Sequence, residues 1–272
     1  MIKARYSETA ARLLFVGLLR PQLRASFHTV NLRFARGLNQ GAINDHDPGA
    51  AVPVIYVANH SSWWDGHLAA LMNHELFHRH AFTIMEESQL QRYKFFRYSG
   101  CFSVDRHGGR SMIESLAYAS NCLNAPNRAL LIFPQGEMLA HDTRPLKLFA
   151  GLARIIQPLK RVRLIPVAFR LEFIGEALPD AFISLGPALD ISGASLIGKQ
   201  LVKDFLGRIT VALTSELDCM TRDIRERNFE DFTVILSGAT SINRWWDDLR
   251  GKTQIRHLGP VKNNVRRYNS GM

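Results

Sequence analysis

A histidine and an aspartate five residues apart are the residues of this chain best suited to proton transfer. His60 follows an apolar run and Asp65 stands where helical periodicity begins, in the stretch N-H-S-S-W-W-D at residues 59–65. A carboxylate that accepts a hydrogen bond from one imidazole nitrogen leaves the other nitrogen free to remove a proton from a hydroxyl, which contributes about 10²–10⁴ in rate. The alternative is that Asp65 only caps the helix and His60 is an ordinary loop residue.

The elements expected around this pair alternate between strand and helix. Apolar runs rich in β-branched residues lie at residues 52–58, 82–85, 129–133, 164–169 and 182–185. Segments with helical periodicity lie at residues 66–77, 89–98, 110–123 and 146–156, and two further helices are expected at 195–227 and 231–249. This order predicts an α/β fold with a mostly parallel sheet flanked by helices, in which ligands bind beyond the carboxyl ends of the strands.

Basic residues are concentrated at the two ends of the chain. Residues 1–36 carry seven basic residues and one acid, and residues 250–272 carry six basic residues and no acid, within a net charge of +10. Residues 10–38 mix apolar residues with arginines, but their longest uncharged apolar run, 13–19, is far shorter than the ~20 residues that span a bilayer. We therefore expect residues 1–45 to form an amphipathic helical segment that anchors the protein peripherally to an anionic membrane, on its cytoplasmic face. The alternative is a helix that packs on the domain.

The rest of the chain divides into a body and a tail. Residues 46–250 are expected to form the α/β domain with its C-terminal helices, and residues 251–272 a basic, loosely ordered tail. No aromatic platform accompanies the basic ends, so nucleic acid is not an expected partner. The cysteines, Cys101, Cys122 and Cys219, are widely spaced. They predict neither a disulfide framework nor a cysteine-based zinc site.

Four sequence blocks resemble those of the glycerolipid acyltransferases typified by bacterial lysophosphatidic acid acyltransferase. Residues 59–65 resemble the N-H-x4-D signature of that family. Three further blocks follow in the family's order: residues 100–106 (G-C-F-S-V-D-R) resemble G-x-x-F-[IV]-[DR]-R, residues 132–137 (I-F-P-Q-G-E) resemble F-P-E-G-T-R, and residues 164–168 (L-I-P-V-A) resemble apolar-x-P-V-x. Four ordered blocks over about 110 residues are more specific than any one of them.

The resemblance implies an O-acyltransferase that moves a fatty acyl group from acyl-CoA or an acyl-carrier protein to a lipid hydroxyl. His60 would be the general base and Asp65 would orient it, with no cofactor, no metal and no covalent acyl-enzyme. Arg106 would bind an anionic group of the acceptor, and a salt bridge to a neighbouring acid is the alternative role. The other substrate-binding residues that the resemblance implies are Asn59, Pro134, Gln135, Gly136 and Glu137.

The third block departs from the family pattern at three positions. Gln135 stands where the family has glutamate, Glu137 where it has threonine, and Met138 where it has arginine. An amide keeps hydrogen bonds but carries no charge, and the missing arginine removes a phosphate contact. The departures put lysophosphatidate in doubt as the acceptor and leave open a lysophospholipid with a larger head group, an amino-acid lipid or a glycosylated isoprenoid. Gly136 is expected to permit a tight turn or a close backbone approach.

A rival pattern, H-E-x-x-H, occurs at residues 74–78. On a helix, His74 and His78 could hold zinc while Glu75 activates water. The sequence after His78 lacks the extension of the zinc proteases and offers no evident third ligand. Two alternatives to acyl transfer therefore remain open. One is this zinc hydrolase, and the other is a peripheral protein that binds lipid without catalysing a reaction.

Overall fold

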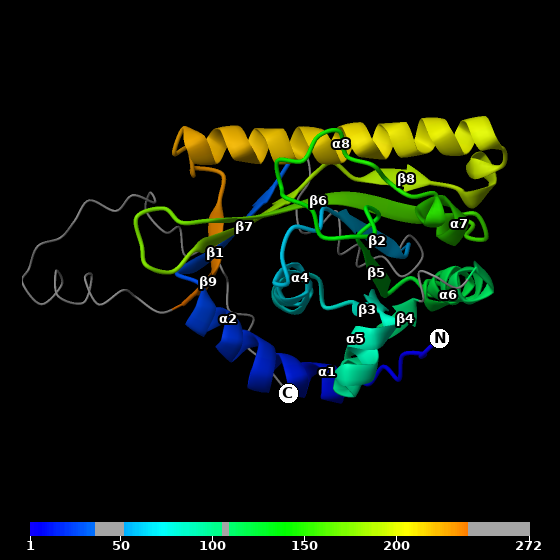
Figure 1. The fold of residues 1–272 in the computed structure, drawn as a ribbon, viewed down its shortest axis with the longest axis horizontal. Helices are drawn as coiled ribbons and strands as arrows, with labels where there is room; N and C mark the ends of the chain where they lie inside the picture. Colours follow the sequence, from blue (N-terminus) through cyan, green and yellow to red (C-terminus); the bar gives the residue numbers. More distant parts are fainter. Residues whose placement is uncertain (36–51, 105–108, 239–272) are drawn as a thin grey trace, which may run out of the picture.

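A nine-stranded sheet forms the centre of the computed structural model, which describes residues 1–35, 52–104 and 109–238 (Figure 1). The order of the strands is β4-β3-β5-β2-β6-β7-β1-β9, and β8 pairs with β6. Their bounds are β1 (Thr29–Phe34), β2 (Val54–Ala58), β3 (His80–Glu86), β4 (Cys101–Val104), β5 (Arg128–Ile132), β6 (Val162–Glu172), β7 (Asp180–Leu185), β8 (Leu189–Ile191) and β9 (Thr233–Ser237). Strands β4, β3, β5, β2 and β6 run parallel to one another, whereas β7 is antiparallel to β6 and β9 is antiparallel to β1. The predicted α/β fold with a mostly parallel sheet is confirmed.

Helices cover both faces of this sheet (Figure 1). One face carries α1 (Glu8–Leu14), the π-helical η1 (Phe15–Leu19), α2 (Arg20–Ser26), α4 (Asp65–Met72) and η2 (Asn73–Phe77). The other face carries α6 (Gly109–Cys122), α7 (Gly151–Ile156) and the long α8 (Lys199–Arg225). The short helices α5 (Glu87–Arg92) and η3 (Lys94–Ser99) join β3 to β4, and η4 (Gly193–Leu196) precedes α8.

Strand β2 explains why the sheet is easy to recognise in the sequence. All five of its residues are buried, because the strand lies between two parallel neighbours and under helices on both faces. Val54 and Tyr56 join the core beneath α4, whereas Ile55 and Val57 join the core beneath α6 and α7. The strand therefore ends where polar residues begin, at Asn59.

The N-terminal helix packs on the domain along one side. Phe15, Leu19 and Leu23 are buried against α4 and the sheet, whereas Leu13 and Val16 on the other side are 68% and 47% exposed. Ser7 caps the start of α1, with its Oγ accepting a hydrogen bond from the amide of residue 10. Among the described helices, none combines the length and the apolar character needed to cross a membrane.

Two of the predicted helical stretches contain strands instead. The N-terminal helix ends at Ser26, and residues 29–34 form β1, so the prediction of a helical segment to residue 45 is wrong there. The physical reason is the alternation V-N-L-R-F, which places Val30 and Leu32 on one face and Asn31 and Arg33 on the other. Residues 233–237 form the edge strand β9 rather than the start of a helix, in keeping with the β-branched run T-V-I. The remainder of the helix predicted to residue 249, and the tail 251–272, lie outside the described residues.

Candidate active site

The sequence blocks gather at the carboxyl edge of the sheet. Residues 59–65 follow β2, residues 133–137 follow β5, and these two parallel strands are neighbours. Strand β6 lies on the other side of β2. Its last residue paired with β2 is Val167, and the strand continues for five residues beyond it, so it flanks the same edge. The carboxyl edge of a parallel sheet is where ligands bind in folds of this class.

His60 and Asp65 form a hydrogen-bonded pair at this edge. The distance from His60 Nδ1 to Asp65 Oδ2 is 2.9 Å, and the Asp65 side chain is fully buried whereas that of His60 is 22% exposed. A carboxylate acceptor at Nδ1 assigns the proton of the neutral ring to Nδ1, which leaves the lone pair on Nε2. The imidazole also stacks on Phe133, with ring centroids 4.2 Å apart, so its plane is fixed.

Asp65 also organises the loop between the two residues. Its Oδ2 accepts hydrogen bonds from the amides of Ser61 and Ser62 at 2.7 and 2.9 Å, and its Oδ1 accepts one from Ser62 Oγ at 2.8 Å. Asp65 is the first residue of α4, where a negative charge stabilises the helix dipole. The amides that it accepts from precede the helix, whose N-cap residue is Trp64, so the carboxylate organises the loop and pairs with His60 but does not cap α4.

The loop after β5 holds the backbone of His60. The His60 amide donates to Gln135 Oε1 at 3.0 Å, and the His60 carbonyl accepts from the amide of Leu139 at 2.9 Å. Gln135 is only 4% exposed, so its side chain faces the histidine loop and not the solvent. Gln135 thus contacts His60 within the protein, and the substrate contact expected from the sequence stays a prediction.

Asn59 is likewise engaged within the protein. Its Nδ2 donates to the carbonyl of Phe169 at 3.0 Å, and its Oδ1 accepts from the amide of Phe169 at 2.8 Å. The side chain is 2% exposed, so it ties the end of β2 to β6 and offers no surface to a substrate. The structure thus gives Asn59 a structural contact where the sequence predicted a substrate contact.

The other residues of the third block form a tight turn at the rim. Gly136 has φ +77°, and a Cβ there would lie 2.8 Å from the ring of Phe149. Pro134 is buried, and its carbonyl accepts from the amide of Phe149, whereas Glu137 and Met138 are exposed. The expectation that Gly136 permits a tight turn is confirmed.

The second block ends at the same edge of the sheet. Its Gly100 has φ +98°, and a Cβ there would lie 2.1 Å from the carbonyl oxygen of Ala81, so only glycine fits. The following residues form β4, which pairs in parallel with β3 and ends at Val104. Arg106, the predicted anion ligand, lies outside the described residues.

An aromatic cluster borders the pair, and the sequence analysis did not predict it. His67 packs against both Trp63 and Trp64, with ring centroids 4.3 and 5.3 Å away, and the two tryptophan rings also contact each other. Burial lowers the pKa of His67 to about 4, so this imidazole is neutral at pH 7. Trp63 is 55% exposed at the rim, and Trp64 packs edge-on against Phe27 at the end of the N-terminal helix. The spacing of three and four residues from the tryptophans to His67, typical of one helix face, is the signal that could have revealed the cluster.

The H-E-x-x-H residues serve a different purpose in the structure. The π-helix η2 ends at Phe77, and His78 lies just beyond it in the left-handed region with φ +49°. The rings of His74 and His78 lie edge to face, with centroids 6.4 Å apart. The ring of His74 stacks on Phe15, and Glu75 lies 3.5 Å from Arg20, which joins η2 to the N-terminal helix. Across the described ranges there is no group of three or more histidine, cysteine or acidic side chains placed to hold a metal ion.

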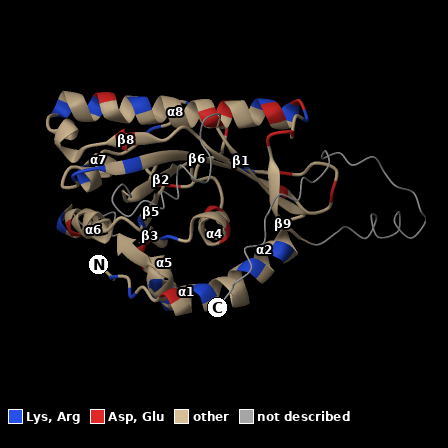
Figure 2. Ribbon diagram, turned by 180° about the vertical axis from the view of Figure 1, so that it is seen from behind, with Lys and Arg blue, Asp and Glu red and all other residues tan. Residues whose placement is uncertain are grey.

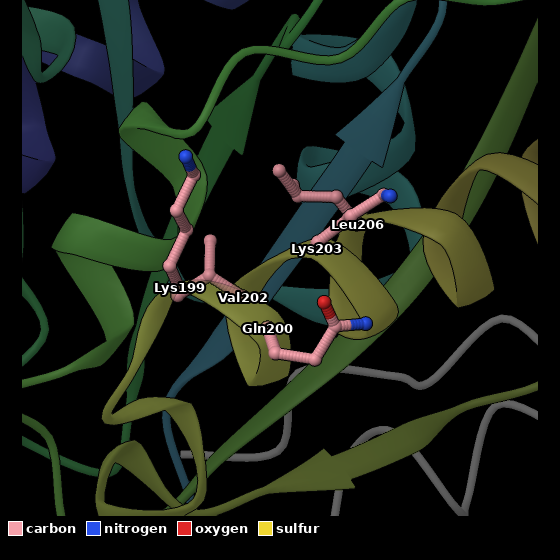
Figure 3. A pocket seen from close by; sticks show the side chains of 5 residues that line it. All are labelled: Lys199, Gln200, Val202, Lys203 and Leu206. Atoms are coloured by element: carbon pink, nitrogen blue, oxygen red, sulfur yellow. The ribbon is translucent and has the colours of Figure 1, made fainter.

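A separate pocket of about 700 Å³ lies on the first turns of α8 and is lined by Lys199, Gln200, Val202, Lys203 and Leu206 (Figure 3). It contains none of the residues described above. Strand β8, which leads to α8, pairs with Val162–Leu164 at the start of β6, so this pocket is near the amino edge of the sheet. The pocket is therefore separate from the His60 site.

Comparison with known families extends these observations. Residues 42–170 match the family model described as Acyltransferase. The matched stretch contains all four sequence blocks and runs from before β2 into β6, whereas the N-terminal helix, β7 and α8 lie outside it. No curated protein matches the chain.

Proposed function

Because residues 42–170 belong to the acyltransferase family, we propose that this protein is an O-acyltransferase that uses His60 as its general base. The observation that carries the proposal is the pair at the carboxyl edge of the sheet, in which a buried Asp65 binds Nδ1 of a partly exposed His60. The acyl donor is a thioester, acyl-CoA or an acyl-carrier protein, and the acceptor is a lipid hydroxyl.

The reaction follows from the state of the imidazole. His60 Nε2 takes the proton of the acceptor hydroxyl as its oxygen attacks the carbonyl carbon of the thioester. The C–S bond of the tetrahedral intermediate then breaks, and the leaving thiolate receives the proton from the imidazolium. Asp65 remains ionised throughout and stabilises the imidazolium that forms between the two steps. Arg106 is the residue proposed to bind an anionic group of the acceptor.

The departures in the third block bear on the acceptor. Glu137 and Met138 are exposed at the rim, so an acid and an apolar side chain stand where the family pattern has threonine and arginine. A carboxylate at the rim repels a second phosphate charge, which disfavours lysophosphatidate. The favoured acceptor is a lysophospholipid or other glycerolipid whose head group shields or lacks the dianionic phosphate, and an amino-acid lipid or a glycosylated isoprenoid is the alternative.

The exposed side of the N-terminal helix suits an anionic membrane surface. Leu13 and Val16 project there together with Arg12 and Arg24, and Figure 2 shows Lys and Arg repeated along this helix. An amphipathic helix with this composition lies in the interface with its apolar side in the lipid. The proposed orientation is a peripheral attachment on the cytoplasmic face of a membrane. Trp63 would lie near that surface, because it contacts Trp64, which packs on Phe27 at the end of the N-terminal helix.

The membrane attachment is tested with vesicles. The double variant Arg12→Glu/Arg24→Glu should bind phosphatidylglycerol vesicles at least about 30-fold more weakly than the native protein, since each basic residue lost near an anionic surface removes about 1 kcal/mol and each glutamate adds repulsion. The matched control Lys203→Glu/Arg208→Glu reverses two exposed cations on α8, across the sheet, and should keep native binding. Equal loss in both double variants would mean that the N-terminal helix is not the attachment site.

The acyl transfer is tested by incubating the purified protein with radiolabelled acyl-CoA or acyl-carrier protein and a panel of lysophospholipids, amino-acid lipids and glycosylated isoprenoids. A labelled lipid should form, and His60→Ala should slow its formation about 10²–10⁴-fold. The control His80→Ala, at a histidine of β3 that is more exposed than His60, should leave the rate unchanged. Vesicle binding without any transfer would support a lipid-binding protein. Stoichiometric zinc, with activity lost in Glu75→Gln and kept in His60→Ala, would support the hydrolase.

A further inference from the structure

Gln135 contacts the loop that carries the general base and lies apart from solvent. Strand β5 ends at Ile132, and the turn that follows is closed by the amide of Gly136, which donates to the carbonyl of Phe133 at 3.0 Å. This turn points the Gln135 side chain toward β2, where its Oε1 accepts the amide hydrogen of His60. The side chain is 4% exposed, and the two residues are 75 positions apart in the sequence.

The same loop also holds the other side of His60. The amide of Leu139 donates to the His60 carbonyl at 2.9 Å, so hydrogen bonds from one loop fix both the N–H and the C=O of this residue. Phe133, which precedes the turn, stacks on the imidazole. Asp65 fixes only Nδ1, and rotation of the peptide would still move Nε2; the contacts from the β5 loop remove that freedom.

We propose that Gln135 is a positioning residue, which holds the backbone of His60 so that Nε2 meets the acceptor hydroxyl. The inference rests on the proposed function and deepens it, because it assigns to Gln135 a part in the reaction other than substrate binding. An amide suits this position because Oε1 accepts the His60 N–H without placing a second buried carboxylate close to Asp65, where an unpaired charge is costly.

The first test compares kinetic constants of three variants. Gln135→Met keeps the length and removes the acceptor, so kcat should fall about 10- to 100-fold with KM for the acceptor nearly unchanged, as expected when a reacting group is displaced by a fraction of an ångström to 1 Å. Gln135→Glu restores an acceptor oxygen and should recover at least half of the loss on a logarithmic scale. The matched control is Gln157→Met, which removes a side-chain bond to the carbonyl of Leu196 far from His60 and should keep native kcat.

The second test does not need turnover. The Nδ1 proton of His60, bonded to Asp65, should give a downfield proton resonance that His60→Ala removes. In Gln135→Met and in the shorter Gln135→Asn this resonance should shift or broaden, and in Gln157→Met it should not. If one of the two Gln135 variants does not fold, the other carries the measurement.

The outcomes separate the inference from the proposed function. A raised KM with native kcat in Gln135→Met would mean that Gln135 binds substrate, and an unchanged His60 resonance would mean that it does not position the ring; either result overturns the inference. A shifted resonance in a protein that transfers no acyl group would leave the positioning contact intact and refute the proposed function alone.

Discussion

Replacement of Asp65 and of His60 should have different effects on activity and on stability. His60→Ala removes a partly exposed ring with one side-chain hydrogen bond. We expect kcat to fall about 10²–10⁴-fold, the contribution of a general base, while the melting temperature changes by no more than a few degrees. Asp65→Ala should lower kcat to a similar extent, since the imidazole loses both its orientation and the charge that stabilises its protonated form.

The stability cost of Asp65→Ala can be worked out from its contacts. The substitution leaves the amides of Ser61 and Ser62 without their acceptor. Both serines are half-buried, so the lower end of the cost of an unmade hydrogen bond applies, about 1 kcal/mol each. Loss of the negative charge from the first turn of α4 adds about 1 kcal/mol. The total of about 3 kcal/mol corresponds to a fall in melting temperature of roughly 6–12 °C for a domain of this size.

Calorimetry and the labelled-acyl assay together test the roles of His60 and Asp65. The double variant His60→Ala/Asp65→Ala should be no slower than His60→Ala alone, because two residues that act as one unit are not additive. A His60→Ala protein with activity within tenfold of the native rate would refute the assignment of the general base. An Asp65→Ala protein that melts early but keeps native kcat would limit Asp65 to holding the loop before α4.

Three further predictions concern the framework of the site. Arg33→Met should lower the free energy of unfolding, measured in urea, by about 3–5 kcal/mol. Its guanidinium is only 6% exposed and pairs with two acidic side chains of α8, which the substitution leaves unpaired. The control Arg110→Ala, at a surface ion pair, should have almost no effect. Gly100→Ala should lower the melting temperature sharply, since its Cβ would overlap a backbone carbonyl, and Gly207→Ala, in the open middle of α8, should raise stability by about 0.5–1 kcal/mol. Burial lowers the pKa of His67 from 6.5 to about 4, so the folded protein keeps this ring neutral while the unfolded chain takes up a proton below pH 6.5. The free energy of unfolding should therefore fall by up to about 3 kcal/mol between pH 6.5 and pH 4, and urea titrations at a series of pH values should show a smaller loss in His67→Phe.

The sequence predicts the parallel half of the sheet well because burial on both faces makes these strands uninterrupted apolar runs. Strand β2, V-I-Y-V-A, is the clearest case, and the polar residues after it mark the edge where the site lies. The blocks that follow β2 and β5 could be assigned to one site since the carboxyl ends of parallel strands share an edge. These inferences need only local pattern and the rules of parallel sheets.

Strand β1 could not be predicted in the same way because one of its two buried faces is polar. Arg33 donates to Ser184 Oγ at 2.6 Å and pairs with Asp223 on α8, and Asn31 donates to the carbonyl of Ala181. The partners lie 150 to 190 residues away in the sequence, so the local pattern gives the arginine no reason to be inside. In the sequence, the same arginine belongs to the basic stretch 1–36, which is expected to face a membrane.

The contacts of Gln135 and Asn59 could not be predicted either, because their partners are distant in the sequence. From the sequence alone, an amide beside a glycine at the end of a strand is as compatible with a ligand as with another loop. In the structure Gln135 faces His60, and Asn59 faces Phe169, so both amides stabilise the loops that meet at the edge. The exposed residues of the block, Glu137 and Met138, are the ones left to contact an acceptor, and both differ from the family pattern.

The contacts of Asp65 decide between the two roles that the sequence leaves open. A carboxylate has two oxygens with about four acceptor positions, and Asp65 fills them with two loop amides, one hydroxyl and one imidazole nitrogen. Both amides precede the helix, whose N-cap residue is Trp64, so these bonds hold the loop and do not cap α4. They prevent rotation of the carboxylate, which therefore presents a fixed acceptor to His60. The five-residue spacing allows the first residue of α4 to reach back to the histidine that follows β2.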